Sequence, residues 1–368
     1  MSENARGRHV AAATNVLLLL ALTAVPVAVY TMLLLGSNDQ GIFAVDFQYT
    51  LLPAAEKLSH GESPYPAYGY PPLVAFSLVP FAFLPYANAF FVAILLASVP
   101  LSLWLLGVRD WRCYSVAFLW SPTFHAVQTA NVSLLLLLGF AVCWRYRDTP
   151  AAVTVAGGLT IAAKIICWPL ALWVAATRRY RGAIGAVAVS LVVTFGLWAT
   201  LGFSGLVRYP SNLDRLTTVV STDSYTVKAL SNDLGAPIGV GRALEVLLAI
   251  LVLACCAYAG YRRDDERSFA FAVLATLVAS PIVWLHSFVL LLAVVAIFRP
   301  RLSGVWLLPI ALWLASGLTP DTWQIVLVLV VAGTVFAVCL LTPTRRRGGS
   351  DLDRLMHPNP PAATGAAG

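Results

Sequence analysis

The chain has 368 residues, of which 59% are hydrophobic and only 11% are charged. An ordinary soluble domain carries about 25% charged residues, so a soluble fold would lack the polar surface needed to cover this apolar bulk. The net charge of +7 comes from arginines that flank apolar runs and form no single patch, which argues against a nucleic-acid interface. The composition therefore predicts an all-α, polytopic membrane protein.

Basic residues are distributed unevenly between alternate loops of this chain. Most of them gather in short arginine clusters: Arg6 and Arg8; Arg109 and Arg112; Arg145 and Arg147; Arg178, Arg179 and Arg181; Arg262, Arg263 and Arg267; Arg299 and Arg301; and Arg345, Arg346, Arg347 and Arg354. This asymmetry indicates that the clustered loops are cytoplasmic. We therefore expect a multi-pass protein of the plasma (inner) membrane with both termini in the cytoplasm.

The apolar runs predict a bundle of about twelve transmembrane helices of ~20 residues each. In chain order they are 13–35, 86–107, 113–122, 127–144, 152–164, 166–177, 183–202, 240–261, 268–284, 287–298, 303–317 and 321–342. Several runs are short, so the helix ends near 122–127, 164–167 and 284–287 must lie at membrane depth. Irregular backbone at that depth has to line a protein-enclosed cavity, and all three turns are expected on the external side.

The first long polar interruption follows the first apolar run. Its apolar residues Phe47, Leu51, Ala54 and Leu58 recur at helical spacing, which predicts a short helix lying in the membrane interface. A proline- and glycine-rich loop follows, with tyrosines suited to the lipid headgroup region. Residues 71–107 are uncharged but are broken by Pro80, Pro85 and Pro100. We expect 71–85 to be a non-spanning or re-entrant helix before the span at 86–107, and one long kinked span is the alternative.

These features predict one transmembrane domain over residues 1–343. It includes a first external loop at 36–85, with interfacial or re-entrant helices, and a second large external loop at 203–239. Residues 344–368 are expected to form a disordered cytoplasmic tail. The six cysteines lie in or beside apolar runs without the spacing of metal ligands, and no acidic pair has such spacing either. We therefore expect no metal and no cofactor.

Three polar residues are not explained by apolar bulk. Asp46 begins the predicted interfacial helix, where it is either a helix N-cap or a catalytic group. Lys164 lies inside an apolar run, where a cation marks a binding site or a charge partner unless it snorkels to the interface. His286 stands at the external end of a run beside Ser280-Pro281, where it is either structural or part of the site.

Further polar residues could contribute to binding on the external side. Gln128 and Asn131 begin a span, where their amides either bind a ligand or join helices by hydrogen bonds. Arg208 and Arg215, in the second external loop, could face an anionic headgroup or simply be solvated. Tyr49 and Tyr65 of the first external loop complete the set of candidate substrate-binding residues.

Taken together, these motifs resemble glycosyltransferase family 87, which has the GT-C membrane fold. The resemblance extends over roughly residues 40–300 and follows the order of the family's motifs. It is carried by Asp46-Phe47 with Tyr49, by Gly61, Pro64-Tyr65, Tyr70-Pro71-Pro72, Pro80 and Leu84-Pro85, by Ser121-Pro122, Gln128 and Asn131, by Ala156-Gly157-Gly158, Lys164 and Pro169, and by Ser280-Pro281, Trp284 and His286.

The resemblance implies a polyprenyl-phosphate sugar donor, with mannose the first expectation, and an inverting transfer to a glycolipid or cell-envelope glycan on the outer face. It also implies that Asp46 is the catalytic base. A phosphate leaving group needs no protonated acid, in contrast to a glycoside, whose hydrolysis uses two carboxylates. We expect Lys164, His286 and an external arginine to stabilise the departing phosphate.

Two other interpretations share much of this pattern. A transporter or flippase of lipid-linked sugars would show the same spans and basic loops, although transporters usually contain repeated halves and no internal repeat is evident. An inactive glycosyltransferase-like subunit is the third interpretation. The sequence does not distinguish among sugars, acceptors or linkages.

Overall fold

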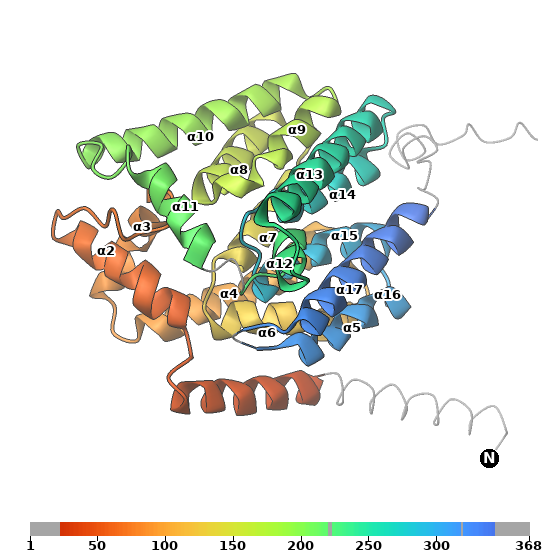
Figure 1. The fold of residues 1–368 in the computed structure, drawn as a ribbon, viewed down its shortest axis with the longest axis horizontal. Helices are drawn as coiled ribbons and strands as arrows, with labels where there is room; N and C mark the ends of the chain where they lie inside the picture. The colour runs from red at the N-terminus through yellow and green to blue at the C-terminus, as the bar shows by residue number, and fades with distance from the viewer. Residues whose placement is uncertain (1–22, 220–222, 318, 343–368) are drawn as a thin grey trace, which may run out of the picture.

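The computed structural model describes residues 23–219, 223–317 and 319–342, which form helices without a β-strand in those ranges (Figure 1). The predicted cytoplasmic start, the first part of the run at 13–35 and the predicted tail at 344–368 lie outside the described residues. Residues 23–39 are helical. The first external loop then contains a π-helical segment η1 (Phe47–Leu51), α2 (Leu52–Ser59), α3 (Pro72–Leu78) and the 3₁₀ turn η2 (Val79–Phe83).

The remaining helices alternate between long apolar rods and short pieces. In order they are α4 (Ala87–Leu105), α5 (Trp111–Phe118), α6 (Ser121–Gln128), α7 (Ser133–Arg145), α8 (Pro150–Ala163), η3 (Ile165–Cys167), α9 (Pro169–Ala176), α10 (Tyr180–Thr200), α11 (Tyr209–Val219), α12 (Val227–Asp233), α13 (Ile238–Tyr261), α14 (Asp265–Val278), η4 (Leu285–Leu290), α15 (Leu291–Phe298), α16 (Gly304–Leu307), η5 (Leu308–Ala315) and α17 (Thr322–Leu341).

Four helices in the described part of the chain are long and apolar enough to cross a membrane: α4, α10, α13 and α17. Large apolar side chains on their outer faces are exposed, for example Ile184 and Val192 on α10 and Leu247 on α13. Such faces are suited to lipid. The protein is therefore a multi-pass membrane protein. The number of twelve spans stays a prediction, because most of the other apolar helices have fewer than 18 residues.

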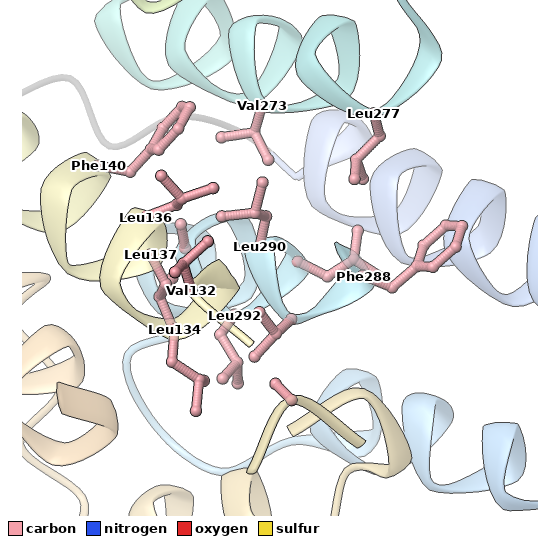
Figure 2. Packing of buried hydrophobic residues seen from close by; sticks show 14 of the residues in the cluster. Val132, Leu134, Leu136, Leu137, Phe140, Val273, Leu277, Phe288, Leu290 and Leu292 are labelled. Carbon is pink, nitrogen blue, oxygen red and sulfur yellow. The ribbon is translucent and has the colours of Figure 1, made fainter. Parts of the chain in front are cut away.

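The interior is built around α7, α14, η4 and α15. Figure 2 shows Leu136, Phe140, Val273, Leu290 and neighbouring side chains meeting there, and α15 is buried along almost its whole length. Beside this core, α8 and α10 run close together (Figure 1). A Cβ on Gly158 would lie 2.6 Å from the Val189 side chain, so glycine is what permits this approach.

Arginine-rich loops that are far apart in sequence meet at one end of the bundle. Arg179 binds both Asp148 and Asp265, with N···O distances of 2.7 and 2.6 Å. Asp110 accepts a hydrogen bond from the backbone of Leu302, and Arg299 donates to the Thr342 hydroxyl. Arg267 also reaches the end of α17, through the carbonyl of Leu340. The loops that the charge pattern placed on one side therefore do share one side of the fold.

The turns between these loops gather at the opposite end. The Ser121 and Ser316 hydroxyls lie 2.9 Å apart, and the Tyr225 hydroxyl donates to the carbonyl of Ala315. The backbone of Tyr225 also donates to Val283, just before η4. The turn at Lys164, between α8 and η3, was predicted, and the break at 279–284 lies just before the predicted 284–287; both line one crevice and so share this end. The helix end predicted near 122–127 is wrong, because these residues lie inside α6.

The first external loop is helical where the apolar spacing predicted it. Phe47, Leu51 and Ala54 are buried along one face, and Glu56 and Lys57 are exposed on the other. Whether this helix lies in the membrane interface stays a prediction. Residues 72–83 form a separate short helical segment, because the chain turns at Tyr86, whose φ is +59°. The structure therefore favours the non-spanning helix over one continuous kinked span.

The segment predicted as a second large external loop contains α11 and α12. The hydroxyl of Tyr209 donates to the carbonyl of Gly69, and the Asn212 amide donates to the carbonyl of Pro66. Tyr65 packs against Trp198 and Tyr209, with ring centroids 5.3 and 6.1 Å away. The second loop therefore contacts the middle of the first loop and helps to hold it in place.

Candidate functional site

Asp46 is positioned by backbone hydrogen bonds between the first external loop and the turn that joins α6 to α7. The backbone N–H of Ala44 donates to the backbone carbonyl of Gln128 at 2.6 Å. The backbone N–H of Asp46 donates to the backbone carbonyl of Thr129 at 3.0 Å. Because both bonds use backbone atoms, they fix the start of the loop whatever its side chains do. They place the Asp46 carboxylate next to the residues that precede α7.

Asn131 is the direct partner of this carboxylate. Its Nδ2 donates to Oδ2 of Asp46 at 2.7 Å. Its Oδ1 accepts two hydrogen bonds from Ser133, one from the backbone N–H at 2.9 Å and one from the hydroxyl at 2.7 Å. A backbone N–H can only donate, so the amide oxygen must face Ser133 and the amide nitrogen must face Asp46. The Asp46 oxygen at this contact is therefore an acceptor.

Tyr70 and Lys164 extend the chain of contacts away from Asp46. The second hydrogen of Asn131 Nδ2 points to the hydroxyl of Tyr70, at 3.3 Å. The ammonium of Lys164 lies 5.9 Å from the centroid of the Tyr70 ring, within cation–π range. Lys164 caps the end of α8 with an extended backbone, φ −150°, so its side chain leaves the helix at this point. The structure thus brings Asp46 and Lys164 into one site.

The electrostatic environment of Asp46 suits a base. Burial raises the pKa of its carboxyl above the ordinary value, while the Asn131 hydrogen bond, the charge of Lys164 and the Thr129 hydroxyl limit that increase. Its side chain makes no helix-capping hydrogen bond, so the N-cap interpretation is not what the structure shows. A carboxylate that few groups bind and that burial makes more basic can accept a proton from a hydroxyl.

A narrow crevice surrounds Lys164 on the side of α14 and η4. Hydroxyl residues line it together with the ammonium, namely Ser133, Thr276, Ser280 and Ser287. Its volume is about 10 Å³, the room of a single water molecule. His286 lies beside Ser287 and is 7% exposed, and its Nε2 is buried without a hydrogen-bond partner among the described residues. His286 is therefore near Lys164, with a ring nitrogen left available.

Within the described ranges, the other predicted site residues are not joined to Asp46 or Lys164 by a hydrogen bond or an ion pair. Gln128 donates to the hydroxyl of Ser37 at 2.7 Å and so ties the helix at 23–39 to α6. Tyr65 donates to the carbonyl of Tyr70 at 2.8 Å. Tyr49 is 71% exposed. Arg208 and Arg215 are exposed on the second external loop. Gln128 and Tyr65 therefore act on the architecture around the site.

Tyr70 and the hydroxyl residues around Lys164 were not among the predicted site residues. Tyr70 did carry a signal, since it precedes two prolines and a residue before proline is held in an extended conformation. Ser280 was noted only as part of the Ser280-Pro281 motif, and the other hydroxyls carried no signal, because serine and threonine are common in helices of membrane proteins. No group of three or more histidine, cysteine or acidic side chains in the described ranges could hold a metal ion.

The fold and the site define a class: a multi-pass helical membrane protein with a buried carboxylate, an amide and a cation gathered where helices are interrupted. Comparison with known proteins specifies it further. The profile of Glycosyltransferase family 87 matches residues 68–284, and the chain belongs to this family. Asn131, Tyr70 and Lys164 lie inside the matched range, Asp46 lies before it, and His286 lies just after it. No solved structure matches the chain.

One curated relative is the polyprenol-phosphate-mannose-dependent alpha-(1-2)-phosphatidylinositol pentamannoside mannosyltransferase of Mycolicibacterium smegmatis. It is 27% identical over 278 residues, which cover 67% of this chain. The chain spans 61% of the length of that relative. The family membership supports a membrane glycosyltransferase.

Proposed function

We propose that the protein transfers a hexose, with mannose the first expectation, from a polyprenyl-phosphate donor to a glycolipid or cell-envelope glycan at the outer face of the plasma membrane. The single observation that carries the proposal is the connected set formed by Asp46, Asn131, Tyr70 and Lys164. It supplies a base and a cation in one site, at the end of the bundle opposite the arginine-rich loops. By the positive-inside rule, that end is external, and both termini are cytoplasmic.

In this proposal Asp46 takes the proton of the acceptor hydroxyl as the hydroxyl oxygen attacks the anomeric carbon. The bond between that carbon and the phosphate oxygen breaks on the opposite side, so the configuration inverts. Polyprenyl phosphate leaves with the bonding electron pair, and Lys164 stabilises the added negative charge. General-base help of this kind contributes roughly 10²–10⁴-fold to a rate. His286, with its free ring nitrogen, and an external arginine, Arg208 or Arg215, assist at the phosphate.

The lipid part of the donor has a candidate position next to this site. An apolar pocket of about 280 Å³ lies among α3, α4, α7 and α8, lined by Leu73, Phe91, Val132, Leu159 and other side chains. Leu136 lines both this pocket and the Lys164 crevice, and Ala163 of the pocket directly precedes Lys164. A phosphate held at Lys164 would therefore have apolar surface beside it for the isoprenoid chain. This continuity supports a lipid-linked donor.

The test is transfer by the purified protein in liposomes that contain a polyprenyl-phosphate hexose and extracted envelope lipids. Asp46→Asn, which keeps the shape of the side chain, should reduce transfer by roughly 10²–10⁴-fold because the base is lost. Asp39→Asn is the matched control, since Asp39 is an exposed carboxylate just upstream. Undiminished transfer in Asp46→Asn would disprove the assignment of the base. Movement of the donor between leaflets without a new glycosidic bond would instead identify a carrier.

A further inference from the structure

Asp46 and Lys164 carry opposite charges within one largely buried site, yet no ion pair joins them among those of the described residues. Their charges do act on each other, because Lys164 is one of the influences on the Asp46 carboxyl. Attraction between such charges is strong where water is scarce. The lysine side chain is also long and flexible, so it could swing to a nearby carboxylate. Some part of the structure must keep the two groups apart.

Tyr70 is the residue that contacts both sides of this site. Its hydroxyl accepts a hydrogen bond from Asn131, the partner of Asp46, and its ring faces the Lys164 ammonium. Its own backbone is held firmly. Pro71 follows it and restricts its conformation, and the Tyr65 hydroxyl donates to its carbonyl at 2.8 Å. The ring therefore belongs to a rigid part of the first external loop.

We propose that Tyr70 is a positioning residue whose ring keeps the Lys164 ammonium from pairing with the Asp46 carboxylate. The ring offers the ammonium a cation–π contact in place of an ion pair. Asp46 then remains an unpaired base, and Lys164 remains free to bind an anion such as phosphate. The roles of base and phosphate ligand rest on the proposed function, whereas the separation of the two charges does not.

The separation can be measured without any substrate, through the reactivity of Lys164 toward reductive methylation. An amine paired with a carboxylate holds its proton more tightly and reacts more slowly. The chain has two other lysines, Lys57 and Lys228, which serve as internal references in the same sample. The labelling rate at Lys164 is followed by mass spectrometry in the full-length protein and in Tyr70→Leu, Asp46→Asn and the double variant.

The proposal predicts that the coupling between Asp46 and Lys164, weak in the wild type, becomes much stronger when the ring is removed. Asp46→Asn should change Lys164 labelling by less than about 2-fold in the wild-type background but accelerate it roughly 10-fold in the Tyr70→Leu background, since a carboxylate in contact shifts an ammonium by one pKa unit or more. Tyr70→Phe keeps the ring and should behave like the wild type. An equal effect of Asp46→Asn in both backgrounds would overturn the proposal.

Transfer assays supply a second, separable result. Tyr70→Leu should lower kcat by roughly 10-fold or more, because Asp46 and Lys164 would then bind each other instead of the substrate. Tyr70→Phe keeps the ring and should retain most of the wild-type kcat. A Tyr258→Ala variant, on the exposed face of α13, is the control. If the wild-type protein transfers no sugar, the proposed function is wrong. The labelling result still decides whether Tyr70 separates the two charges.

Discussion

Asp46 and Asp110 are the same residue type at opposite ends of the bundle, and their surroundings differ in every respect that matters for chemistry. Asp110 accepts hydrogen bonds from the backbone N–H and the guanidinium of Arg112 and from the backbone of Leu302. These donors occupy both of its oxygens, and they lower the pKa of its carboxyl to about 2. Asp110 is therefore a structural anion that joins two loops.

Asp46 has fewer donors, and its charged neighbour is held at a distance. One amide hydrogen of Asn131 binds it, while burial moves the pKa of its carboxyl upward. The comparison shows that burial together with the number of donors, and not the presence of a carboxylate beside a helix start, separates a capping aspartate from a basic one. It also explains why sequence alone left both roles open for Asp46.

The largest effect after loss of Asp46 itself is expected at Lys164. Lys164→Met keeps the length of the side chain but removes the cation, and it should reduce transfer by roughly 10²-fold, the range for losing one stabilising group at a departing charge. Lys57→Met is the matched control, because Lys57 is exposed on α2. Initial rates at saturating donor measure the effect. Full activity in Lys164→Met would contradict the role of Lys164 at the departing phosphate, and its contact with Tyr70 would then have no part in transfer.

The next largest effect concerns the pH dependence of transfer. Asn131→Ala removes a hydrogen bond that lowers the pKa of the Asp46 carboxyl, so that pKa should rise further. The base must be deprotonated to act, so activity is lost as the pH falls through its pKa. The acidic limb of the kcat/KM profile should therefore move to higher pH. Gln128→Leu should leave the limb in place, since Gln128 binds Ser37 instead.

The contrast with Asp110 predicts a change in stability without a change in chemistry. Asp110→Ala removes the cap of α5 and should lower the free energy of unfolding in detergent by about 1–2 kcal/mol, with kcat nearly unchanged. Because the folded-state pKa is lowered, this contribution is complete above the unfolded pKa of about 4 and is lost as the pH falls toward about 2. The difference in unfolding free energy between wild type and Asp110→Ala should disappear over that pH interval. Asp214→Ala, at an exposed carboxylate, should not change the unfolding free energy at any of these pH values.

Periodic features of the fold were predictable from sequence, and contacts between distant segments were not. The spacing of Phe47, Leu51 and Ala54 predicted their helix, because it matches one helical face. The break at Lys164 was predictable since a cation precedes Trp168-Pro169 inside an apolar run. By contrast, α11 carries few apolar residues, and Tyr209 and Asn212 anchor it to the first loop. A helix that depends on such partners gives little local signal.

The residues of the candidate site also differ in how far the sequence could predict them. Asp46, Lys164 and Asn131 were identifiable because each is a polar group that apolar surroundings make costly. Gln128 and Tyr65 looked similar, but their partners, Ser37 and the carbonyl of Tyr70, could only be found in three dimensions. The prolines after Tyr70 indicated its conformation but not its partners. Tyr70 was missed because its importance lies in its contacts with Asn131 and Lys164, which come from distant segments.

The smallest effect is expected at the two external arginines. Arg208 and Arg215 are exposed, and the hydrogen bond from Arg215 to the Asn212 side chain is long, 3.4 Å. Exposed charges act through water and are screened by salt, so Arg208→Gln and Arg215→Gln should each lower kcat/KM less than about 3-fold. Even that effect should vanish when the ionic strength is raised to ~1 M, where the Debye length is about 3 Å. A loss of 10-fold or more that salt does not reduce would mean that one arginine moves onto the phosphate, and Lys164 would then not be the principal cation.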